Sequence, residues 1–415
     1  MRVELPPPAS APVHARIVTL TLAAAAFGYF VDAFDILLFN VVRVPSLEGL
    51  GVPQADQFAA GVMLFNFQMG GMLLGGLALG VWGDRRGRRS VLFGSIVLYS
   101  LANLANAWIQ GIPAYAAARF IAGVGLAGEL GAGVTLVCEL LPPEKRGYGT
   151  GLIATVGVLG GLAAPLVGEH LPWRTAYLVG GLAGLALLLL RASVPESAMY
   201  RSAARATSRR GDLRLLLASR ERAARLGRAL LIGLPVWFSL SILATFGPEV
   251  GRALGIDPPP TAPRALLYAQ VGLVLGDVAS ALLSQLFRTR KWVMLAFLAL
   301  DGLAITLCLT ATSATAGRYY ALCALLGLAN GYWVLFITNA AEQFGTNLRA
   351  TVATAAPNLI RGSTILITNL FLLLGHMLGV IGSAALVGAI CLGAALVAVL
   401  RSAETFGKRL DYLET

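Results

Sequence analysis

The feature that most constrains this chain is the recurrence of apolar segments about 20 residues long, each able to cross a hydrocarbon layer of roughly 30 Å as a helix. The composition agrees, because a sequence with 57% hydrophobic and only 13% charged residues has more apolar surface than one soluble core can bury. The sequence therefore predicts an all-α membrane protein. Twelve spans are expected, at residues 16–42, 57–82, 90–108, 113–139, 147–168, 174–191, 226–248, 265–287, 292–313, 317–340, 351–378 and 380–401.

The positive charges alternate between the two ends of the predicted spans. Most Lys and Arg residues lie in every second connecting segment, and the opposite segments hold Arg43, Arg174, Arg252, Arg264 and Arg318. Positive charge stays on the cytoplasmic side during insertion, so both termini are predicted to be cytoplasmic. Topology thus explains the net charge of +11, and we expect no nucleic-acid partner. The lack of an Asn-x-Ser/Thr site fits a bacterial inner membrane.

One long connecting segment divides the twelve predicted spans into six and six. Residues 192–225 form an arginine-rich linker, which is predicted to lie in the cytoplasm. Residues 1–191 and 226–415 are the two predicted six-helix bundles.

A short charged pattern occurs once in each predicted bundle. Glu139 stands seven residues before Arg146, and Glu342 stands seven before Arg349, at an offset of 203 residues. The two positions correspond only if the halves are parallel copies of one six-helix unit. The sequence therefore predicts two pseudo-symmetric six-helix bundles.

The predicted cytoplasmic loop "GVWGDRRGRRS", from Gly80 to Ser90, combines glycines, one carboxylate and several arginines. Glycines allow a tight turn and close helix contact, and an aspartate can accept hydrogen bonds from a neighbouring helix N-terminus. The residues that carry this pattern are Gly80, Asp84, Arg85, Gly87, Arg88 and Arg89.

This pattern resembles the signature of the major facilitator superfamily. "RFIAGVGLAGE", from Arg119 to Glu129, is similar to the helix 4 motif of its sugar, phosphate and organic-acid branches. "DAFD", from Asp32 to Asp35, resembles the paired aspartates of its proton-coupled phosphate and aromatic-acid symporters. The resemblance implies two six-helix bundles that rock about a central site by alternating access. It also implies that the loop pattern and the two Glu-to-Arg pairs act in gating on the cytoplasmic side.

Four ionisable residues inside the spans suggest a proton pathway. Such a residue costs roughly 2.5 to 3.5 kcal/mol at a helix centre, so it should face a partner or the bundle interior. Counted along their helices, Asp35 and Arg119 lie at the same depth and could form an ion pair, while Asp32 shares a helix face with Asp35. Glu129 lies deeper and is a candidate inner proton station. The alternative is a static charge network that fixes the helices.

Arg361 is the candidate substrate-binding cation, because a guanidinium at mid-membrane suits a carboxylate or phosphate. Asn358 shares its helix face. The alternative is that Arg361 serves as a charge partner for Asp277 or Asp301. The remaining candidate substrate-binding residues are Asn66, Gln68, Asp277, Trp237, Asn330, Tyr332 and Trp333.

These observations favour a secondary active transporter, most simply a proton-coupled symporter of a small organic anion. The excess of buried carboxylates leaves open a proton-coupled antiporter that exports cationic or amphiphilic compounds, and a sensor on the same fold is a further alternative. Three histidines far apart in the sequence give no metal or nucleophilic site, so we expect no enzyme activity, cofactor or metal. The expected partners are substrate, protons and membrane lipids, and the expected state is a monomer.

Overall fold

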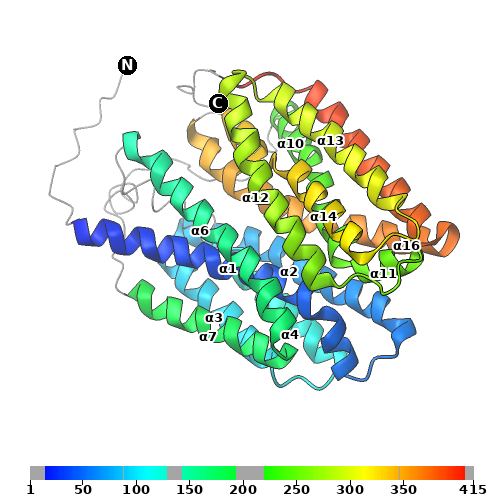
Figure 1. The fold of residues 1–415 in the computed structure, drawn as a ribbon. Coiled ribbons are helices and arrows are strands. Elements are labelled where there is room, and N and C mark those ends of the chain that lie inside the picture. The colour runs from blue at the N-terminus through cyan, green and yellow to red at the C-terminus, as the bar shows by residue number, and fades with distance from the viewer. Residues whose placement is uncertain (1–14, 87, 129–142, 193–218, 345, 407–415) are drawn as a thin grey trace, which may run out of the picture.

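The computed structural model describes residues 15–86, 88–128, 143–192, 219–344 and 346–406, and helices make up most of these ranges (Figure 1). The helices of the first half are α1 (Ala15–Gly49), α2 (Gln54–Arg86), α3 (Arg88–Asn106), α4 (Ile112–Leu126), α6 (Pro143–His170) and α7 (Trp173–Ala192). Those of the second half are α10 (Arg220–Phe238), the π-helix η1 (Ser239–Thr245), α11 (Gly247–Ala253), α12 (Ala262–Leu286), α13 (Lys291–Leu309), α14 (Ala316–Asn330), α15 (Trp333–Glu342) and α16 (Thr346–Leu400). No strand occurs in the described ranges.

Eight helices in the described residues are long and apolar enough to cross a membrane. Two predicted spans correspond to shorter apolar helices, Ser90–Asn106 and Ile112–Leu126. The last two predicted spans are joined in α16, whose backbone leaves the helical region only at Gly379 (φ 69°, ψ 176°). Glycine adopts this positive φ without strain, so the predicted break between residues 378 and 380 is confirmed.

Two other predicted spans are interrupted inside the second half. Gly331 separates α14 from α15, and a Cβ atom on it would lie 2.1 Å from the backbone of Gly276, so close contact with α12 explains the break. The span predicted at 226–248 begins earlier, at Arg220, and passes through η1 into α11. In η1, the Thr245 hydroxyl donates to the carbonyl of Leu240 at 2.9 Å, which matches the wider spacing of a π-helix.

The segment Gly80 to Ser90 is mostly helical, so its prediction as a loop was wrong. Helix α2 continues through Asp84 to Arg86, and α3 begins at Arg88. The segment contains no proline, and a helix can extend beyond the bilayer into water, where its charged side chains are solvated.

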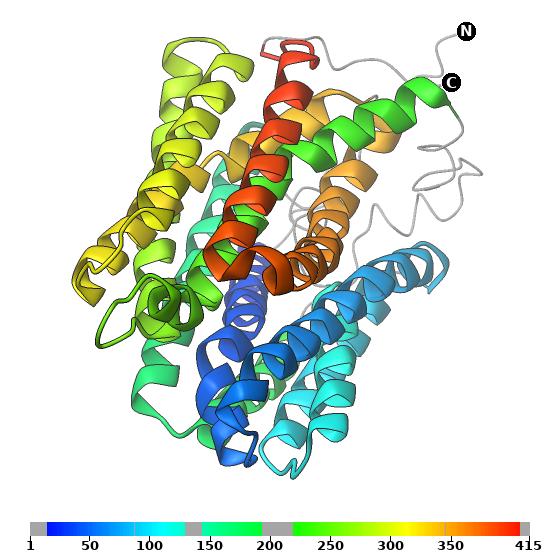
Figure 2. The same ribbon diagram turned by 90° about the vertical axis from the view of Figure 1, so that its right-hand side faces the viewer.

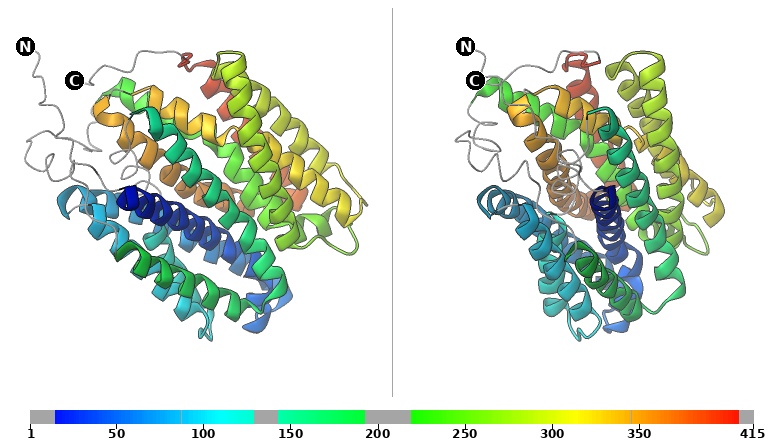
Figure 3. Two further views of the ribbon diagram at one scale, coloured as in Figure 1. Left: turned by 60° about the vertical axis from the view of Figure 1, so that its left-hand side comes forward. Right: turned by 90° about the vertical axis from the view of Figure 1, so that its left-hand side faces the viewer.

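The two halves occupy separate regions of the molecule, with the blue and cyan helices on one side and most of the yellow and red ones on the other (Figure 2). In the first half α1 packs on α6, α2 on α4 and α3 on α7. In the second half the corresponding pairs are α10 with α16, α12 with α14 and α13 with α16. Between the halves, α2 contacts α16 and α6 lies beside α12 (Figure 3).

Glycines make the same close contact in both halves. A Cβ atom on Gly71 of α2 would lie 2.1 Å from the Phe120 carbonyl oxygen of α4. One on Gly272 of α12 would lie 2.0 Å from the Ala324 carbonyl oxygen of α14. These contacts recur at nearly the offset of the Glu-to-Arg pattern, which supports two parallel copies of one unit.

Candidate functional site

Two carboxylates of α1 lie in the interior of the first half. Asp32 is 0% exposed and Asp35 is 1% exposed. Glycines let α1 approach its neighbours closely: a Cβ atom on Gly160 of α6 would lie 1.9 Å from the Phe30 carbonyl oxygen. One on Gly180 of α7 would lie 2.6 Å from Oδ1 of Asp35. Larger residues at these glycines would push α1 and its carboxylates away.

Arg119 of α4 is a fully buried cation close to Asp35. Its Nη2 donates to Oδ1 of Asn103 at 2.6 Å, and its Cζ lies 4.8 Å from the ring centroid of Tyr177. The ion pairs among the described residues do not include Asp35 with Arg119. Counting residues along the spans predicted that Asp35 and Arg119 lie at the same depth. In this structure the guanidinium of Arg119 donates to Asn103.

Sequence reasoning missed the neutral groups around Arg119. The hydroxyls of Tyr115 and Tyr177 are 2.6 Å apart, and Tyr115 donates to the Ser46 hydroxyl at 3.1 Å. All three residues are fully buried. Isolated Tyr, Ser and Asn residues in apolar segments have no common spacing, so only the packing of helices α1, α3, α4 and α7 shows this network.

Arg361 of α16 lies where the two halves meet. It is 5% exposed, and its Nη1 donates to Oδ1 of Asn358 at 3.2 Å. Nδ2 of Asn358 donates to the Ala127 carbonyl of the first half at 3.2 Å. Among the described residues Arg361 forms no ion pair, so neither Asp277 nor Asp301 neutralises it directly.

Aromatic rings lie beside this guanidinium. Cζ of Arg361 is 6.0 Å from the ring of Trp237, which packs edge-on against Trp333 at 6.5 Å between centroids. Trp333 in turn lies 5.2 Å from Phe336. The buried indole Nε1 of Trp237 has no hydrogen-bond partner in the described structure. A buried cation, an indole donor and aromatic faces together can hold a planar anion.

Tyr29 of α1 is a further residue that sequence reasoning missed. The charges of Arg361, Asp32 and Asp277 all act on its hydroxyl group. Tyr29 therefore lies within electrostatic range of charges from both halves. Gln68 of α2 is fully buried, and neither atom of its amide has a hydrogen-bond partner among the described residues.

Two other candidate residues have their polar groups engaged by the protein. Nδ2 of Asn66 donates to Asn369 at 3.2 Å, and Asn66 accepts from Thr368 at 2.6 Å, which joins α2 to α16. The Tyr332 hydroxyl donates to the Ile232 carbonyl at 2.8 Å. We interpret Asn66 as a contact between the halves and Tyr332 as a packing residue.

Asp301 of α13 is 0% exposed and lies inside the second half. Its Oδ1 accepts from Nδ2 of Asn330 at 3.0 Å and from the Ser239 hydroxyl at 3.4 Å. Nδ2 of Asn330 also donates to the Leu326 carbonyl at 2.8 Å, so this candidate substrate ligand is engaged as well. Oδ2 of Asp301 and Oδ1 of Asn330 have no partner in the described structure.

An ion pair joins the halves at the predicted external end. The guanidinium of Arg43 donates to both carboxylate oxygens of Glu249 at 2.8 and 2.9 Å, and to the Thr245 carbonyl at 3.2 Å. Its Cζ lies 4.5 Å from the ring of Phe246. The prediction that Arg43 lies in a loop was wrong, because α1 continues to Gly49 and buries it completely.

The fold and the sites can be set beside known proteins. A family model described as Major Facilitator Superfamily matches residues 25–368. The chain belongs to the Major Facilitator Superfamily. The resemblance seen in the sequence motifs is thereby confirmed, and the chain is a multi-pass membrane protein.

Curated relatives of this superfamily member have transporter names. The niacin transporter of Acinetobacter baylyi is 32% identical over 184 residues, which are 43% of this chain and 41% of that protein. In this and the next two relatives, the chain covers less than half of the relative's length. The gentisate transporter of Corynebacterium glutamicum is 27% identical over 421 residues, which cover 93% of this chain and 89% of that protein.

Solved structures in the superfamily share the fold. The crystal structure of a D-xylose-proton symporter matches with a TM-score of 0.70 and 19% identity, covering 95% of this chain and all of that one. At this identity the match shows the fold alone, and it supports a twelve-helix arrangement in two bundles.

The structure describes the side chains of only some of the residues that were predicted to act in gating. Nη2 of Arg290 lies 3.3 Å from Glu342, whose second oxygen accepts from Thr405 at 2.7 Å. Glu342 is thus paired within the second half. Gly87, Glu129 and Glu139 lie outside the described residues. Only backbone is described for Gly80, Asp84, Arg85, Arg88, Arg89, Arg146 and Arg349.

Proposed function

We propose that this protein is a secondary active transporter that couples the symport of a small aromatic carboxylate to protons by alternating access. The observation that carries this proposal is Arg361, a buried guanidinium at the contact between the halves that forms no ion pair among the described residues. A buried cation without a charged partner is costly, and a carboxylate substrate would offset that cost.

The surroundings of Arg361 support an aromatic anion. The guanidinium can bind both oxygens of a carboxylate, while Trp237 and Trp333 offer ring faces and edges at packing distance. The unpartnered amide of Gln68 can serve a ring substituent. Niacin and gentisate, which the names of two relatives carry, are both aromatic carboxylates.

Asp32 and Asp35 are the proposed proton carriers. Two carboxylates one helical turn apart in a buried site do not both ionise readily, and Arg119 favours the ionised form of one of them. Proton uptake at α1 would remove a negative charge from the interior of the protein and so favour the binding of a substrate anion.

Alternating access would use the ionic contacts at the two ends. The ion pair of Arg43 with Glu249 would open and close at the predicted external end, and Glu342, which pairs with Arg290 in this structure, would act at the predicted cytoplasmic gate. We further propose that the protein works as a monomer in a bacterial inner membrane with both termini in the cytoplasm. The boundaries of the two bundles and the linker stay as the sequence predicts them.

The direct test is proton movement into proteoliposomes that contain the purified protein and an interior pH dye. Nicotinate, gentisate, phosphate, a sugar and an amphiphilic cation are added outside, one at a time. Interior acidification with the aromatic acids alone is expected, and Arg361→Gln should abolish it. Arg318→Gln is the matched control, because Arg318 is exposed and lies at the predicted external end of the second half, away from the central site.

The other outcomes are equally informative. Proton movement in the opposite direction with the cation alone would show the exporter instead. Retained acidification in Arg361→Gln would contradict the assignment of the anion site, since the guanidinium then contributes nothing to binding. Arg361→Lys keeps the charge but loses the planar fork, so it should bind the acids more weakly than the native protein does.

A further inference from the structure

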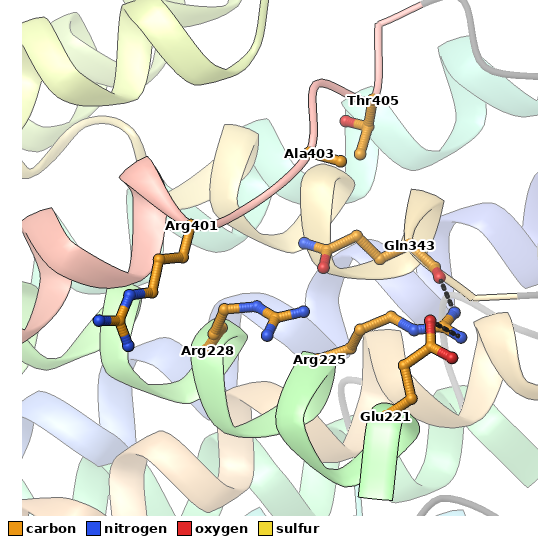
Figure 4. Close-up of a pocket in the computed structure, with 7 residues that line it drawn as sticks. All are labelled: Glu221, Arg225, Arg228, Gln343, Arg401, Ala403 and Thr405. Carbon is orange, nitrogen blue, oxygen red and sulfur yellow. Dashed lines mark hydrogen bonds and ion pairs between the residues drawn. The ribbon is translucent and has the colours of Figure 1, made fainter. Parts of the chain in front are cut away.

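A polar cavity lies in the second half, at the predicted cytoplasmic end. Its volume is about 500 Å³. Figure 4 shows that its walls come from the start of α10, the end of α15 and the segment that follows α16. The lining residues are Glu221, Arg225, Arg228, Gln343, Arg401, Ala403 and Thr405.

Three guanidinium groups line this cavity, and only one of them has an acidic partner. Arg225 lies 3.1 Å from Glu221 and donates to the Gln343 carbonyl at 2.9 Å (Figure 4). Arg228 and Arg401 form no ion pair within the described part of the chain, and Nε of Arg228 is buried without a hydrogen-bond partner. Within the residues that the structure describes, two positive charges at the cavity therefore have no acidic partner.

Two nearby carboxylates, those of Glu342 and Glu404, already bind other groups. Glu342 is held by Arg290 and by Thr405. Glu404 accepts from the backbone N–H groups of Arg290 at 2.9 Å and Lys291 at 3.2 Å at the start of α13. Partial burial alone would raise the pKa of Glu404, but its hydrogen bonds, from Thr289 and from the backbone, lower that pKa to about 2.

Hydrogen bonds hold the segment after α16 in place, and this segment forms one wall of the cavity. Nζ of Lys291 donates to the carbonyls of Leu400 at 2.7 Å and Ser402 at 3.1 Å. Nδ2 of Asn339 donates to the Thr405 hydroxyl at 3.0 Å. Arg401 is thereby held at the rim of the cavity, at the end of α16.

We propose that this cavity binds a phosphate group through its arginines, Arg228 and Arg401. Guanidinium groups bind phosphate oxygens by charge-assisted hydrogen bonds, and the buried Nε of Arg228 offers a donor that would otherwise stay unsatisfied. The phosphate can come from an anionic phospholipid or from a soluble compound in the cytoplasm. Leu400 and Trp292 are 56% and 66% exposed next to Arg401 and Lys291, so lipid can reach the rim.

The test measures binding without transport, so it is independent of the proposed symport. The purified full-length protein in detergent is titrated with short-chain phosphatidylglycerol, short-chain phosphatidylcholine or inorganic phosphate, and its thermal unfolding temperature is followed. Binding to the folded state raises this temperature. Arg401→Gln should raise about tenfold the ligand concentration needed for a given rise in unfolding temperature, as the loss of one charge-assisted hydrogen bond predicts.

The pattern of responses identifies the source of the phosphate. Stabilisation by phosphatidylglycerol alone indicates a lipid headgroup, and stabilisation by inorganic phosphate as well indicates a soluble ligand. Arg228→Gln is the second variant, and Arg318→Gln, which removes an exposed charge at the opposite end, is the control that should respond like the native chain. The proposal is overturned if no phosphate compound stabilises the protein, or if both cavity variants respond as the control does.

Discussion

Asp35 in the first half and Asp301 in the second are both completely buried aspartates, yet their surroundings differ. Asp35 lies beside Arg119, an equally buried cation. Asp301 has only the neutral donors Asn330 and Ser239. A negative charge on Asp35 can be balanced by a neighbouring cation, whereas a charge on Asp301 would be stabilised only by hydrogen bonds from neutral donors.

The comparison separates two functions that the sequence could not separate. Oδ1 of Asp301 accepts from Asn330 and from Ser239, so this side chain bonds α13 to α14 and to η1. Asp301 is in this way a structural link inside the second half. Its presence therefore does not favour a cationic substrate, and the exporter alternative loses one of the carboxylates that suggested it.

The largest effect is expected at Asp35. Asp35→Asn removes the titratable group, so proton-driven accumulation of substrate in proteoliposomes should be lost. Asp301→Asn keeps a side chain of the same shape that can still bond to Asn330, so transport should remain within about twofold of the native rate, because the bonded pair is preserved. Equal loss of transport in both variants would remove the distinction between the two halves.

The glycine contacts that the halves share should respond alike. Gly71→Ala and Gly272→Ala each force a methyl group against a backbone carbonyl, which is expected to cost about 3 kcal/mol of unfolding free energy. Thermal or denaturant unfolding in detergent measures this. Gly94→Ala and Gly393→Ala are matched controls, because open space surrounds these glycines, and an effect as large in the controls would show that the close contacts are unimportant.

Asp301→Leu tests the structural link by a smaller change in stability. The substitution leaves the amide of Asn330 with one acceptor fewer in a buried site, at a cost of about 2 kcal/mol. Asp301→Asn should be destabilised less than Asp301→Leu in the same unfolding measurement. If leucine is tolerated as well as asparagine, the hydrogen bond does not hold α13 to α14.

The smallest effect concerns Glu404, a surface carboxylate that serves as a reference for the two buried ones. Its folded-state pKa of about 2 lies below its ordinary value of 4.5, so its ionised form stabilises the fold above the ordinary value. This contribution should be lost as the pH falls from about 4.5 through 2. Glu404→Gln should unfold with a weaker pH dependence in that window, and an unchanged profile would show that the carboxylate is not held by α13.

Parts of the candidate site could be predicted from the sequence, because counting residues along a span gives the depth of a side chain in the membrane. Residue counts along two antiparallel spans put Asp35 and Arg119 at the same level, and both side chains are buried in the first half. Residue counts could not show that the Arg119 guanidinium donates to Asn103, since rotation about a helix axis decides which neighbour a side chain faces. For the same reason Asp301 had no clear role in the sequence.

A helical membrane protein with a parallel repeat could be predicted from the residues alone, because the length and spacing of apolar segments are constrained by the bilayer and not by tertiary contacts. The burial of Arg43, its ion pair with Glu249 and the cation close to Asp35 became evident only from the packing of the helices. These depend on contacts between residues far apart in the chain. Such contacts form only when glycines allow the helices to approach and the two halves meet.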